Sequence, residues 1–417
     1  MKTIHADQSC GIVGPSPLLL CFSHLRWDFV FQRPQHLLSR AALDYRVIFW
    51  EEPAGAAEQK PGIVPRLETR ITAQGVMVAT PVLPPGLDIE ATNRVLIGLL
   101  DGLLAERGVR PSVVWYYSPM FLPIAAHVSA QVTVYDCMDE LSLFEGASPQ
   151  LRLLERRLLK SADLVFAGGR SLFQSKRALH GHVHCFPSSV DVGHFRIARL
   201  QGGLADPSDQ ARLARPRLGY FGVIDERMDL ALVAGIADRR PDWQIMMLGP
   251  VAKIDPASLP QRDNVHWLGG KPYAALPAYL AHWDVGLMPF ALNASTRFIS
   301  PTKTPEYLAA GVPVISTPIA DVVSDWGEGG FVEIASTAEQ AVAAAERVMA
   351  RGLSEWQTRV DMRLAHMSWD RTWAAMRDQI DQFFSAPAPM QGRMATLGQG
   401  VWRTERSETA ALSRVGD

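Results

Sequence analysis

Short apolar runs alternate with longer amphipathic stretches along most of this chain. In the first half the apolar runs, rich in Val, Leu, Ile and aromatic residues, are residues 17–22, 45–50, 112–116, 131–135 and 163–167. Runs of this kind are typical of strands that are covered on both faces. The stretches with helical spacing are residues 34–42, 91–107 and 148–160. The alternation predicts a parallel α/β sheet.

The same alternation restarts in the second half, after a change of composition. Residues 193–216 are rich in Gly, Asp, Ser, Gln, Arg and Pro, so we expect a linker there. The strands expected after it are residues 217–223, 243–248, 265–268, 285–289 and 312–317. The helices expected are residues 228–239, 273–281, 302–310, 337–352 and 368–384. We predict two doubly wound α/β domains that face a cleft, residues 15–200 and 215–367, and a flexible tail at residues 385–417.

Length, charge and cysteine content narrow the class of protein. A chain of 417 residues exceeds the usual size of one core, which agrees with two domains. Its 41 Lys and Arg against 43 Asp and Glu give a net charge of −2, which argues against a nucleic-acid binder. The four cysteines, Cys10, Cys21, Cys137 and Cys185, have no CxxC spacing and are typical of reduced thiols in an intracellular protein.

No segment is predicted to enter a membrane. The N-terminus lacks an apolar signal core, and the run at residues 18–22 is too short to span a bilayer. The helix within residues 148–160 carries cations beside an apolar stripe, so it either packs its leucines on the sheet or rests on anionic lipids. We expect a cytoplasmic protein, and peripheral attachment to the inner face of a membrane stays open.

The strongest candidate site begins at residue 294. A strand precedes it and a helix is expected to start near Pro301, with Ser300 as N-cap and Lys303 in the first turn. A helix N-terminus beside a lysine is suited to a diphosphate, and Glu306 could accept two sugar hydroxyls, which together would describe a nucleotide. The alternative is that Ser300 and Glu306 only stabilise the helix and that Lys303 is solvated.

The segment SPTKTPEYLAAGVPVIST (residues 300–317) resembles the donor-binding signature of GT-B-fold glycosyltransferases of the group 1 or family 4 type. The order of elements agrees over residues 18–384. SHLRWDFVFQRPQHLLSR (23–40), VYDCMDE (134–140), SADLVFAGGRSLF (161–173) and NVHWLGGKPYAALPAYLAHWDVGLMPF (264–290) are similar to a bacterial subgroup linked to surface-polysaccharide assembly, which includes teichuronic-acid-type transferases.

The resemblance implies two Rossmann-like domains, with a helix at residues 368–384 that crosses back to the first. It implies a hexosyltransferase-type enzyme that takes a sugar from a nucleotide-sugar, with UDP expected as the carrier, and transfers it with retention to a saccharide or polyprenyl-linked acceptor in surface-polysaccharide synthesis. It implies neither a metal ion nor a cofactor. The donor-binding residues that we expect are Gly222, Arg227, Gly269, Gly270, Ser300, Thr302, Lys303 and Glu306. The alternative for Gly269 and Gly270 is that they serve only the backbone geometry of the turn.

The sequence departs from the pattern of this family at the phosphate site. Val223 and Met228 stand where many relatives have an arginine and a lysine, and Phe298 stands where the first of two glutamates is usual. A leaving diphosphate needs compensating positive charge. Our hypothesis is that Arg297 and Lys303 supply that charge, with Arg227 as a third cation.

The first domain is expected to hold the acceptor. The loop after its first strand contains a charged and aromatic set suited to a sugar ring and a phosphate, namely His24, Arg26, Trp27, Asp28 and Arg33. The alternative is a structural loop with its aromatic residues packed beneath it. Asp139 follows another strand and is our candidate for the group that orients or deprotonates the acceptor hydroxyl.

Two other functions remain open on this architecture. A nucleotide-sugar epimerase would bind the same donor without an acceptor. A non-catalytic nucleotide-sugar-binding partner of an assembly complex would fit the departures at Val223, Met228 and Phe298. A nicotinamide-dependent dehydrogenase is disfavoured, because no GxGxxG follows a predicted strand.

Overall fold

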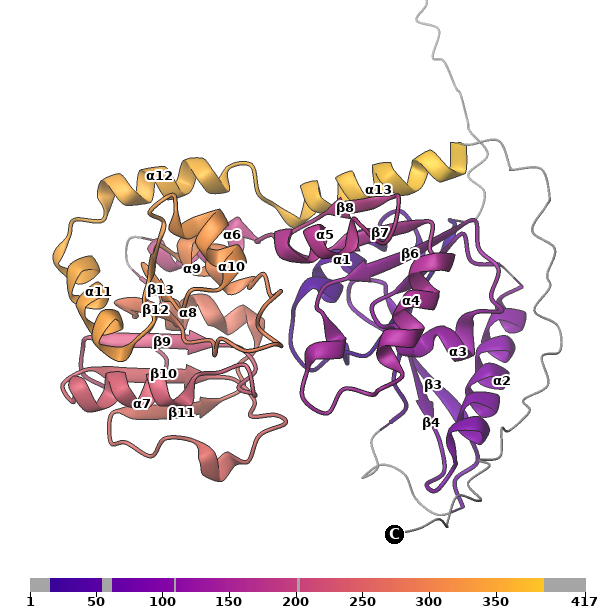
Figure 1. The fold of residues 1–417 in the computed structure, drawn as a ribbon, viewed down its shortest axis with the longest axis horizontal. Helices are drawn as coiled ribbons and strands as arrows, with labels where there is room; N and C mark the ends of the chain where they lie inside the picture. The colour runs from indigo at the N-terminus through magenta and orange to yellow at the C-terminus, as the bar shows by residue number, and fades with distance from the viewer. Residues whose placement is uncertain (1–15, 55–61, 109, 201–202, 386–417) are drawn as a thin grey trace, which may run out of the picture. The chain divides into compact units, whose positions relative to one another are not determined.

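The computed structural model describes residues 16–54, 62–108, 110–200 and 203–385. The predicted tail beyond Ser385 and the thiol of Cys10 lie outside these residues. The described chain forms two α/β units, each built on its own sheet (Figure 1). Within the described part of the chain, no helix combines the length and the apolar character that crossing a bilayer requires.

The first sheet has eight strands in the order β3-β4-β2-β1-β5-β6-β7-β8. Its strands are β1 (Leu18–Ser23), β2 (Arg46–Glu51), β3 (Arg66–Ile71), β4 (Met77–Val82), β5 (Val113–Tyr116), β6 (Val132–Cys137), β7 (Leu164–Ala167) and β8 (Val183–Cys185). Its helices are α1 (Arg33–Ala41), α2 (Ile89–Arg107), α3 (Leu122–Ala125), α4 (Leu151–Ser161) and α5 (Arg170–Lys176). The antiparallel edge strand β3 was not predicted, because it is polar and largely exposed and so lacks an apolar run.

The second sheet has six parallel strands in the order β11-β10-β9-β12-β13-β14. They are β9 (Arg217–Phe221), β10 (Gln244–Leu248), β11 (Val265–Gly269), β12 (Val285–Met288), β13 (Val314–Ser316) and β14 (Val332–Ile334). The helices that follow the first sheet are α6 (Val192–Arg196), α7 (Leu230–Arg239), α8 (Leu276–Leu280), α9 (Lys303–Ala310), α10 (Ala320–Val322), α11 (Ala338–Ala350), α12 (Ser354–Leu364) and α13 (Trp369–Ser385).

The expected linker at residues 193–216 is only partly irregular. Helix α6 occupies its first residues, and Phe195 of this helix is fully buried in the core of the second sheet. The prediction was wrong there because the sequence of α6 is too short to show a helical period.

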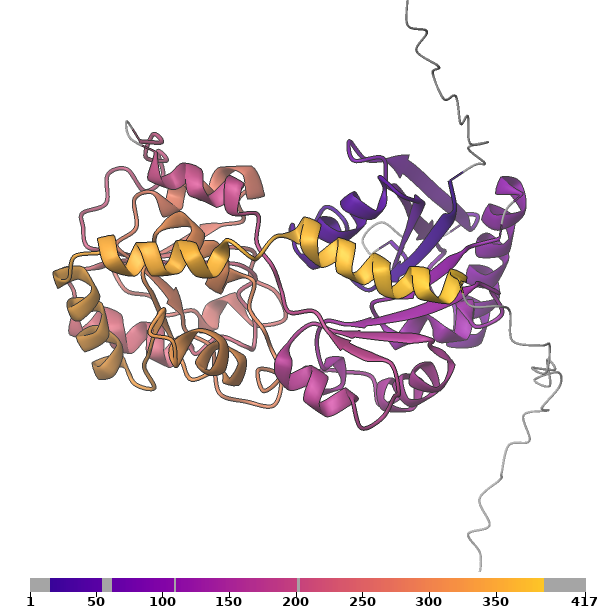
Figure 2. The same ribbon diagram turned by 90° about the horizontal axis from the view of Figure 1, so that it is seen from above.

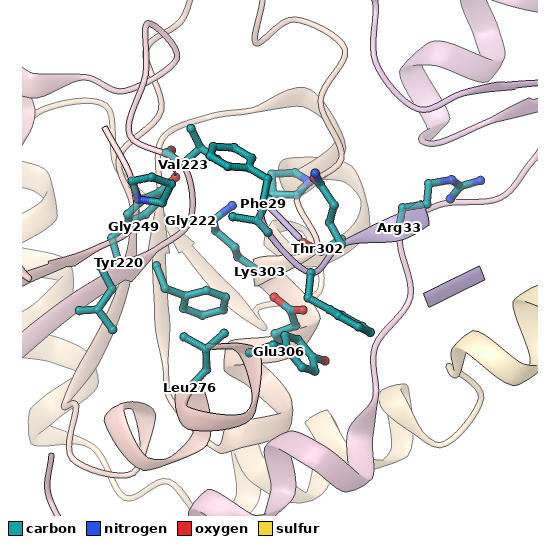
Figure 3. A pocket seen from close by; sticks show the side chains of 18 of the residues that line it. Phe29, Arg33, Tyr220, Gly222, Val223, Gly249, Leu276, Thr302, Lys303 and Glu306 are labelled. Carbon is teal, nitrogen blue, oxygen red and sulfur yellow. Dashed lines mark hydrogen bonds between the residues drawn. The ribbon is translucent and has the colours of Figure 1, made fainter. Parts of the chain in front are cut away.

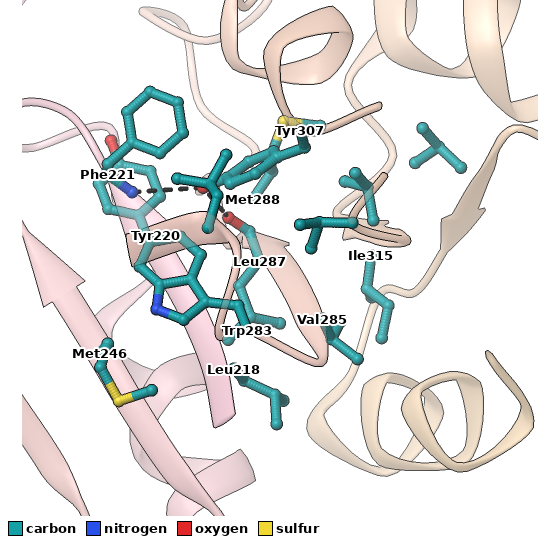
Figure 4. Close-up of a cluster of buried hydrophobic side chains, with 14 of the residues drawn as sticks. Leu218, Tyr220, Phe221, Met246, Trp283, Val285, Leu287, Met288, Tyr307 and Ile315 are labelled. Carbon is teal, nitrogen blue, oxygen red and sulfur yellow. Dashed lines mark hydrogen bonds between the residues drawn. The ribbon is translucent and has the colours of Figure 1, made fainter. Parts of the chain in front are cut away.

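The core of the second sheet fixes the position of α9. The ring of Tyr307 is buried, and its hydroxyl accepts a hydrogen bond from the Phe221 amide at 3.2 Å and donates to the Leu287 carbonyl at 3.3 Å (Figure 4). A Cβ at Gly219 would lie 2.2 Å from the Trp283 ring, so only glycine allows this ring to cross the strand. These contacts hold α9 against β9 and β12, and its first turn therefore lies at the carboxyl edge of the sheet.

The last helix returns to the first domain, as predicted. Trp369, Trp373, Met376 and Ile380 of α13 are buried in the core beside β1 and β5. The indole of Trp373 also donates a hydrogen bond of 2.8 Å to Asp44. Figure 2 shows α13 running across the strands of the first sheet after α12 has run along the second domain.

Helix α4 was predicted either to pack its leucines on the sheet or to rest on anionic lipids. Leu154, Leu158 and Leu159 are buried, whereas Arg156 and Arg157 are exposed. Most of the leucines therefore pack on the domain, whereas Leu153 and the arginines face solvent.

Candidate active site

A cavity of about 490 Å³ lies at the carboxyl ends of strands from both sheets. The first domain contributes residues that follow β1 and β6, and the second contributes the ends of β9 and β10 and the first turn of α9. Ligands of open α/β sheets bind at this end of the strands. Figure 3 shows the side chains of Lys303 and Glu306 from α9 beside Gly222 and Phe29.

Helix α9 begins one residue later than the expected range 302–310 and two residues later than a helix capped by Ser300 would begin. Its first residue is Lys303, and Thr302 precedes it without a side-chain capping hydrogen bond. Ser300 is therefore not the N-cap, and that prediction was wrong. The reason is Pro305, which has no amide to donate to the Pro301 carbonyl, so the first regular bond of the helix runs from Glu306 to Thr302 at 3.4 Å.

Lys303 lies against the end of β9. Its Nζ is 5.4 Å from the centroid of the Tyr220 ring and 5.9 Å from that of Phe290. Gly222 has a φ of +134°, and a Cβ there would lie 2.2 Å from the lysine Cε, so glycine makes room for this side chain. Burial, together with the positive charge of Arg227, lowers the pKa of Lys303. No carboxylate of the described residues lies within 4.0 Å of its ammonium group.

Glu306 is on the same helix, one turn further along, and only 4% of its surface is exposed. Burial raises the pKa of its carboxyl group, and the nearby Lys303 opposes this rise. The carboxylate lines the cavity, and no hydrogen bond from a described side chain reaches it. It is thus able to accept hydrogen bonds from a ligand.

Arg227 supplies a second cation from the loop after β9. Its guanidinium donates to both carboxylate oxygens of Asp225, at 3.0 Å from Nε and 2.6 Å from Nη2. It also lies over the Phe144 ring of the first domain, 5.3 Å from the centroid. Arg227 therefore lines the cavity with part of its charge already paired.

Asp139 faces these cations from the first domain, in the segment after β6. Burial raises the pKa of its carboxyl group to about 6, partly opposed by Arg227. A carboxylate with such a pKa can take up a proton near neutral pH. The cavity thus holds cations and an acid on the side of the second domain and a potential base on the side of the first.

Comparisons with known proteins agree with this arrangement. Residues 215–351 match the family described as Glycosyl transferases group 1. The chain resembles these transferases. Over 236 residues it is 28% identical to TuaH of Bacillus subtilis (strain 168), described as a teichuronic acid biosynthesis glycosyltransferase, and this match covers 52% of our chain and 59% of TuaH. The predicted resemblance to group 1 and teichuronic-acid-type transferases is therefore confirmed.

Solved structures share the fold over almost the whole chain. A sucrose-phosphate synthase from Thermosynechococcus elongatus superposes with a TM-score of 0.63 at 15% identity, covering 89% of this chain and 100% of that one. A UDP-forming α,α-trehalose-phosphate synthase from Burkholderia xenovorans, in complex with glucose-6-phosphate, also gives 0.63 at 14% identity, covering 88% and 100%. The predicted GT-B fold is confirmed.

Most of the predicted donor residues meet at the cavity of this GT-B fold. Those that line it are Gly222, Arg227, Gly270, Ser300, Thr302, Lys303 and Glu306. Gly269 and Arg297 are not among the lining residues. Arg297 is exposed, and its guanidinium lies over the ring of Phe298, 5.2 Å from the centroid. The structure therefore does not place Arg297 beside Lys303.

Of the predicted acceptor residues, Trp27 and Arg33 are buried in the first domain, His24 and Arg26 are partly buried, and Asp28 is exposed. Arg33 borders the cavity, but it is 2% exposed and points away from Lys303 and Glu306 (Figure 3). Its Nε and Nη2 donate to the Asp136 carboxylate at 2.9–3.1 Å, and its Nη1 donates to the Phe186 carbonyl at 2.7 Å. The guanidinium thus connects the start of α1 to β6 and to the residue after β8.

Of the other four predicted acceptor residues, three do not line the cavity and one does. Arg26 donates to the Pro53 carbonyl at 2.6 Å, Trp27 is packed edge-on against Phe49, and His24 does not line the cavity. Asp28 does line the cavity and is exposed, although it pairs with Arg70.

Two groups of lining residues were not predicted. Phe29 and Phe31 of the first-domain loop are 48% and 37% exposed and border the cavity. Tyr273 lines it from the second domain, with its ring stacked between Phe31 at 4.7 Å and His194 at 4.4 Å. The sequence did not show which of Trp27, Phe29 and Phe31 are buried, because the loop is irregular and has no period that separates buried from exposed positions.

Proposed function

We propose that this protein is a hexosyltransferase-type glycosyltransferase that moves a sugar from a UDP-sugar to a saccharide or polyprenyl-linked acceptor. The observation that carries the proposal is the position of Lys303, Arg227 and Glu306 in a cavity that Asp139 faces from the other domain. The proposed setting is the synthesis of a surface polysaccharide, in the cytoplasm or at the inner face of a membrane.

In this proposal the second domain binds the donor. Lys303 and Arg227 neutralise the diphosphate. The cation–π contacts of Lys303 with Tyr220 and Phe290 hold the ammonium group in place before the ligand binds. Glu306 accepts hydrogen bonds from two sugar hydroxyls. Backbone groups near Gly270 contact the nucleobase. The departures at Val223 and Met228 leave these two cations as the main source of positive charge.

The transfer step needs one bond to break and one to form. The bond between the anomeric carbon and the diphosphate oxygen breaks, and UDP keeps the electron pair. The acceptor oxygen bonds to the same carbon, on the face that the diphosphate leaves, so the configuration is retained. The acceptor proton passes to Asp139 or to the departing phosphate oxygen. We propose that no metal ion or cofactor takes part, because the two cations balance the developing charge.

The first domain would bind the acceptor through the exposed rings of Phe29 and Phe31 and through Asp28. Aromatic faces bind the apolar faces of sugar rings, and a carboxylate accepts their hydroxyls. The name of TuaH supports a polysaccharide product, and the UDP-forming trehalose-phosphate synthase supports UDP as the leaving nucleotide.

Calorimetric titration of the purified protein tests the donor. We expect UDP and at least one UDP-sugar to bind, GDP to bind at least tenfold more weakly, and Lys303→Ala to lose at least tenfold in UDP affinity without a change in melting temperature. EDTA should not change the affinity. Equal binding of UDP by the parent and by Lys303→Ala would contradict the proposal.

Product analysis distinguishes the rival functions. A transferase needs both a UDP-sugar and an acceptor extract for turnover. An epimerase would convert the UDP-sugar alone, and a non-catalytic binding partner would bind UDP but release none from any UDP-sugar in the presence of acceptor. Either of the last two results would overturn transfer while leaving the donor site in place.

A further inference from the structure

A second cavity, of about 650 Å³, lies beside the candidate active site. Ser188, Ser300 and Pro301 line both cavities, so two short stretches of the chain lie between them. The second cavity is otherwise lined by residues 187–189, by the π-helical segment η6 (Val323–Gly327), and by the end of α12 and the start of α13. Figure 2 shows these two helices following one another with a short connection.

The charge in this cavity is unbalanced. The ionisable side chains that line it are Arg170, Asp325, Arg359, Arg363, His366 and Arg371. Asp325 accepts from Arg170 at 2.8 Å, so its negative charge is already paired. Over the part of the chain that the structure describes, no carboxylate lies within 4.0 Å of Arg359, Arg363 or Arg371. Three cations therefore face this space without an anion of the protein.

Nearby charged residues behave differently. Asp361 of α12 pairs with Arg196 and Arg199, and Asp370 of α13 pairs with Arg40. These helices therefore have acidic residues, but they face away from the cavity. The excess of positive charge is local.

The two arginines that α12 contributes are exposed, and each lies over an aromatic ring; Arg359 also donates a hydrogen bond to the Gly329 carbonyl. The guanidinium of Arg363 lies 5.4 Å from the Trp326 ring and that of Arg359 lies 5.3 Å from the Phe331 ring. Arg359 and Arg363 are four residues apart on α12, and like charges at this spacing repel one another. Stacking on a ring fixes the plane of a guanidinium and leaves N–H donors at its edge for an anion.

We propose that this second cavity binds an anionic saccharide, whose carboxylate or phosphate groups pair with Arg359, Arg363 and Arg371. The volume exceeds what a single phosphate needs and is in the range of cavities that hold small molecules. Ser188 and Ser189 in the lining offer hydroxyl partners for a sugar. The choice of a saccharide rests on the proposed transferase function, whereas the anionic character rests on the arginines alone.

Titration of the full-length protein, saturated with UDP, tests this site. Tetragalacturonate is the carboxylate probe, glucose 6-phosphate is the phosphate probe, and maltotetraose is the neutral comparison. We expect at least one anionic probe to bind at least tenfold more tightly than maltotetraose. The double variant Arg363→Gln/Arg371→Gln should weaken that binding at least tenfold and leave UDP binding unchanged.

The matched control is Arg156→Gln/Arg157→Gln on α4, which removes two exposed arginines from the first domain and should change the binding by less than twofold. Arg371→Gln alone, which removes no ring contact, serves if the double variant fails to fold. Equal losses in the two double variants, equal binding of maltotetraose, or no binding of either anion would overturn the proposal. Failure of UDP to bind, with arginine-dependent binding of an anionic probe intact, would instead remove the transferase function and leave this site.

Discussion

The two domains bring charged residues to the candidate active-site cavity at the starts of α1 and α9, and they use them in different ways. In the first domain, Arg33 is 2% exposed and its donors are satisfied by Asp136 and by a backbone carbonyl. In the second domain, Lys303 has no carboxylate of the described chain within 4.0 Å. A cation whose hydrogen bonds are satisfied internally stabilises the fold, whereas a cation without such partners is available to a ligand.

The aromatic residues of the first loop show the same division. Trp27 is 7% exposed and packs on Phe49, whereas Phe29 is 48% exposed at the cavity. One short segment thus contains both the residues that hold it and the residues that can contact a substrate.

The largest expected effect is on stability, from Arg33. Arg33→Met leaves Asp136 buried without its partner and should lower the free energy of unfolding by about 3–5 kcal/mol, measured in urea. Arg33→Met/Asp136→Leu should recover most of this loss. The control is Arg26→Met, whose pair with Glu51 is partly exposed and should cost about 0–1 kcal/mol. If Arg33→Met were as stable as the parent and bound the acceptor less well, Arg33 would be a ligand-binding residue and not a structural one.

Lys303 should affect turnover and not stability. Lys303→Ala removes charge from the proposed diphosphate site, and we expect kcat/KM to fall about 10²–10³-fold in a coupled UDP-release assay. Arg297→Ala is the matched control, because this arginine comes from the same loop but is exposed outside the cavity. It should remain within twofold of the parent. If both variants stayed within twofold, the assignment of the phosphate site would be wrong.

The pH dependence should reveal Asp139. A base must be ionised, and burial raises the pKa of Asp139 to about 6, so kcat/KM should fall as the pH drops below about 6, instead of below about 4 as for an exposed aspartate. Lys303 must be protonated to bind the diphosphate. Because its pKa is lowered, kcat/KM should also fall as the pH rises, at a pH below the ordinary pKa of lysine.

Asp139→Asn should lower the rate by about 10²-fold and flatten the acidic limb. Glu306, whose pKa is also raised, faces the same cavity, so Glu306→Gln is measured in parallel. An acidic limb that persists in Asp139→Asn and disappears in Glu306→Gln would move the titrating group to the second domain.

The smallest expected effect concerns the exposed rings. Phe29→Ala should raise the KM for the acceptor about threefold to tenfold with kcat unchanged, as expected for the loss of one aromatic contact of roughly 0.5–1.5 kcal/mol. The control is Leu153→Ala, an exposed apolar side chain on α4. No change in acceptor KM would remove Phe29 from the proposed acceptor site and leave Phe31 and Asp28.

Local patterns predicted many of the strands and helices and the segment around Lys303. The strands of both sheets that lie in continuous apolar runs, such as β1 and β10, were recognised within a residue or two. Strands β3, β4, β8 and β14 and helices α6 and α12 were not predicted. Strand β3 is polar, β8 and β14 have three residues each, and α6 is less than two turns long. The segment around Lys303 was predicted to line a ligand site, and it does line the cavity; adjacent residues carry all of its features.

The sequence by itself determined the alternation of strands and helices and the segment that holds Lys303 and Glu306, because each of these depends on residues that are near one another in the chain. The return of α13 to the first domain was implied only by the family resemblance, because its contacts, such as that of Trp373 with Asp44, join distant parts of the chain. Only the tertiary structure decided which polar side chains are free. Arg33 meets Asp136 and Phe186 across more than a hundred residues of chain, and the arginines at the end of α12 and the start of α13 line one cavity with residues 187–189, which are also distant in the chain. Whether a charge is paired depends on partners that are distant in sequence, and no local pattern records them.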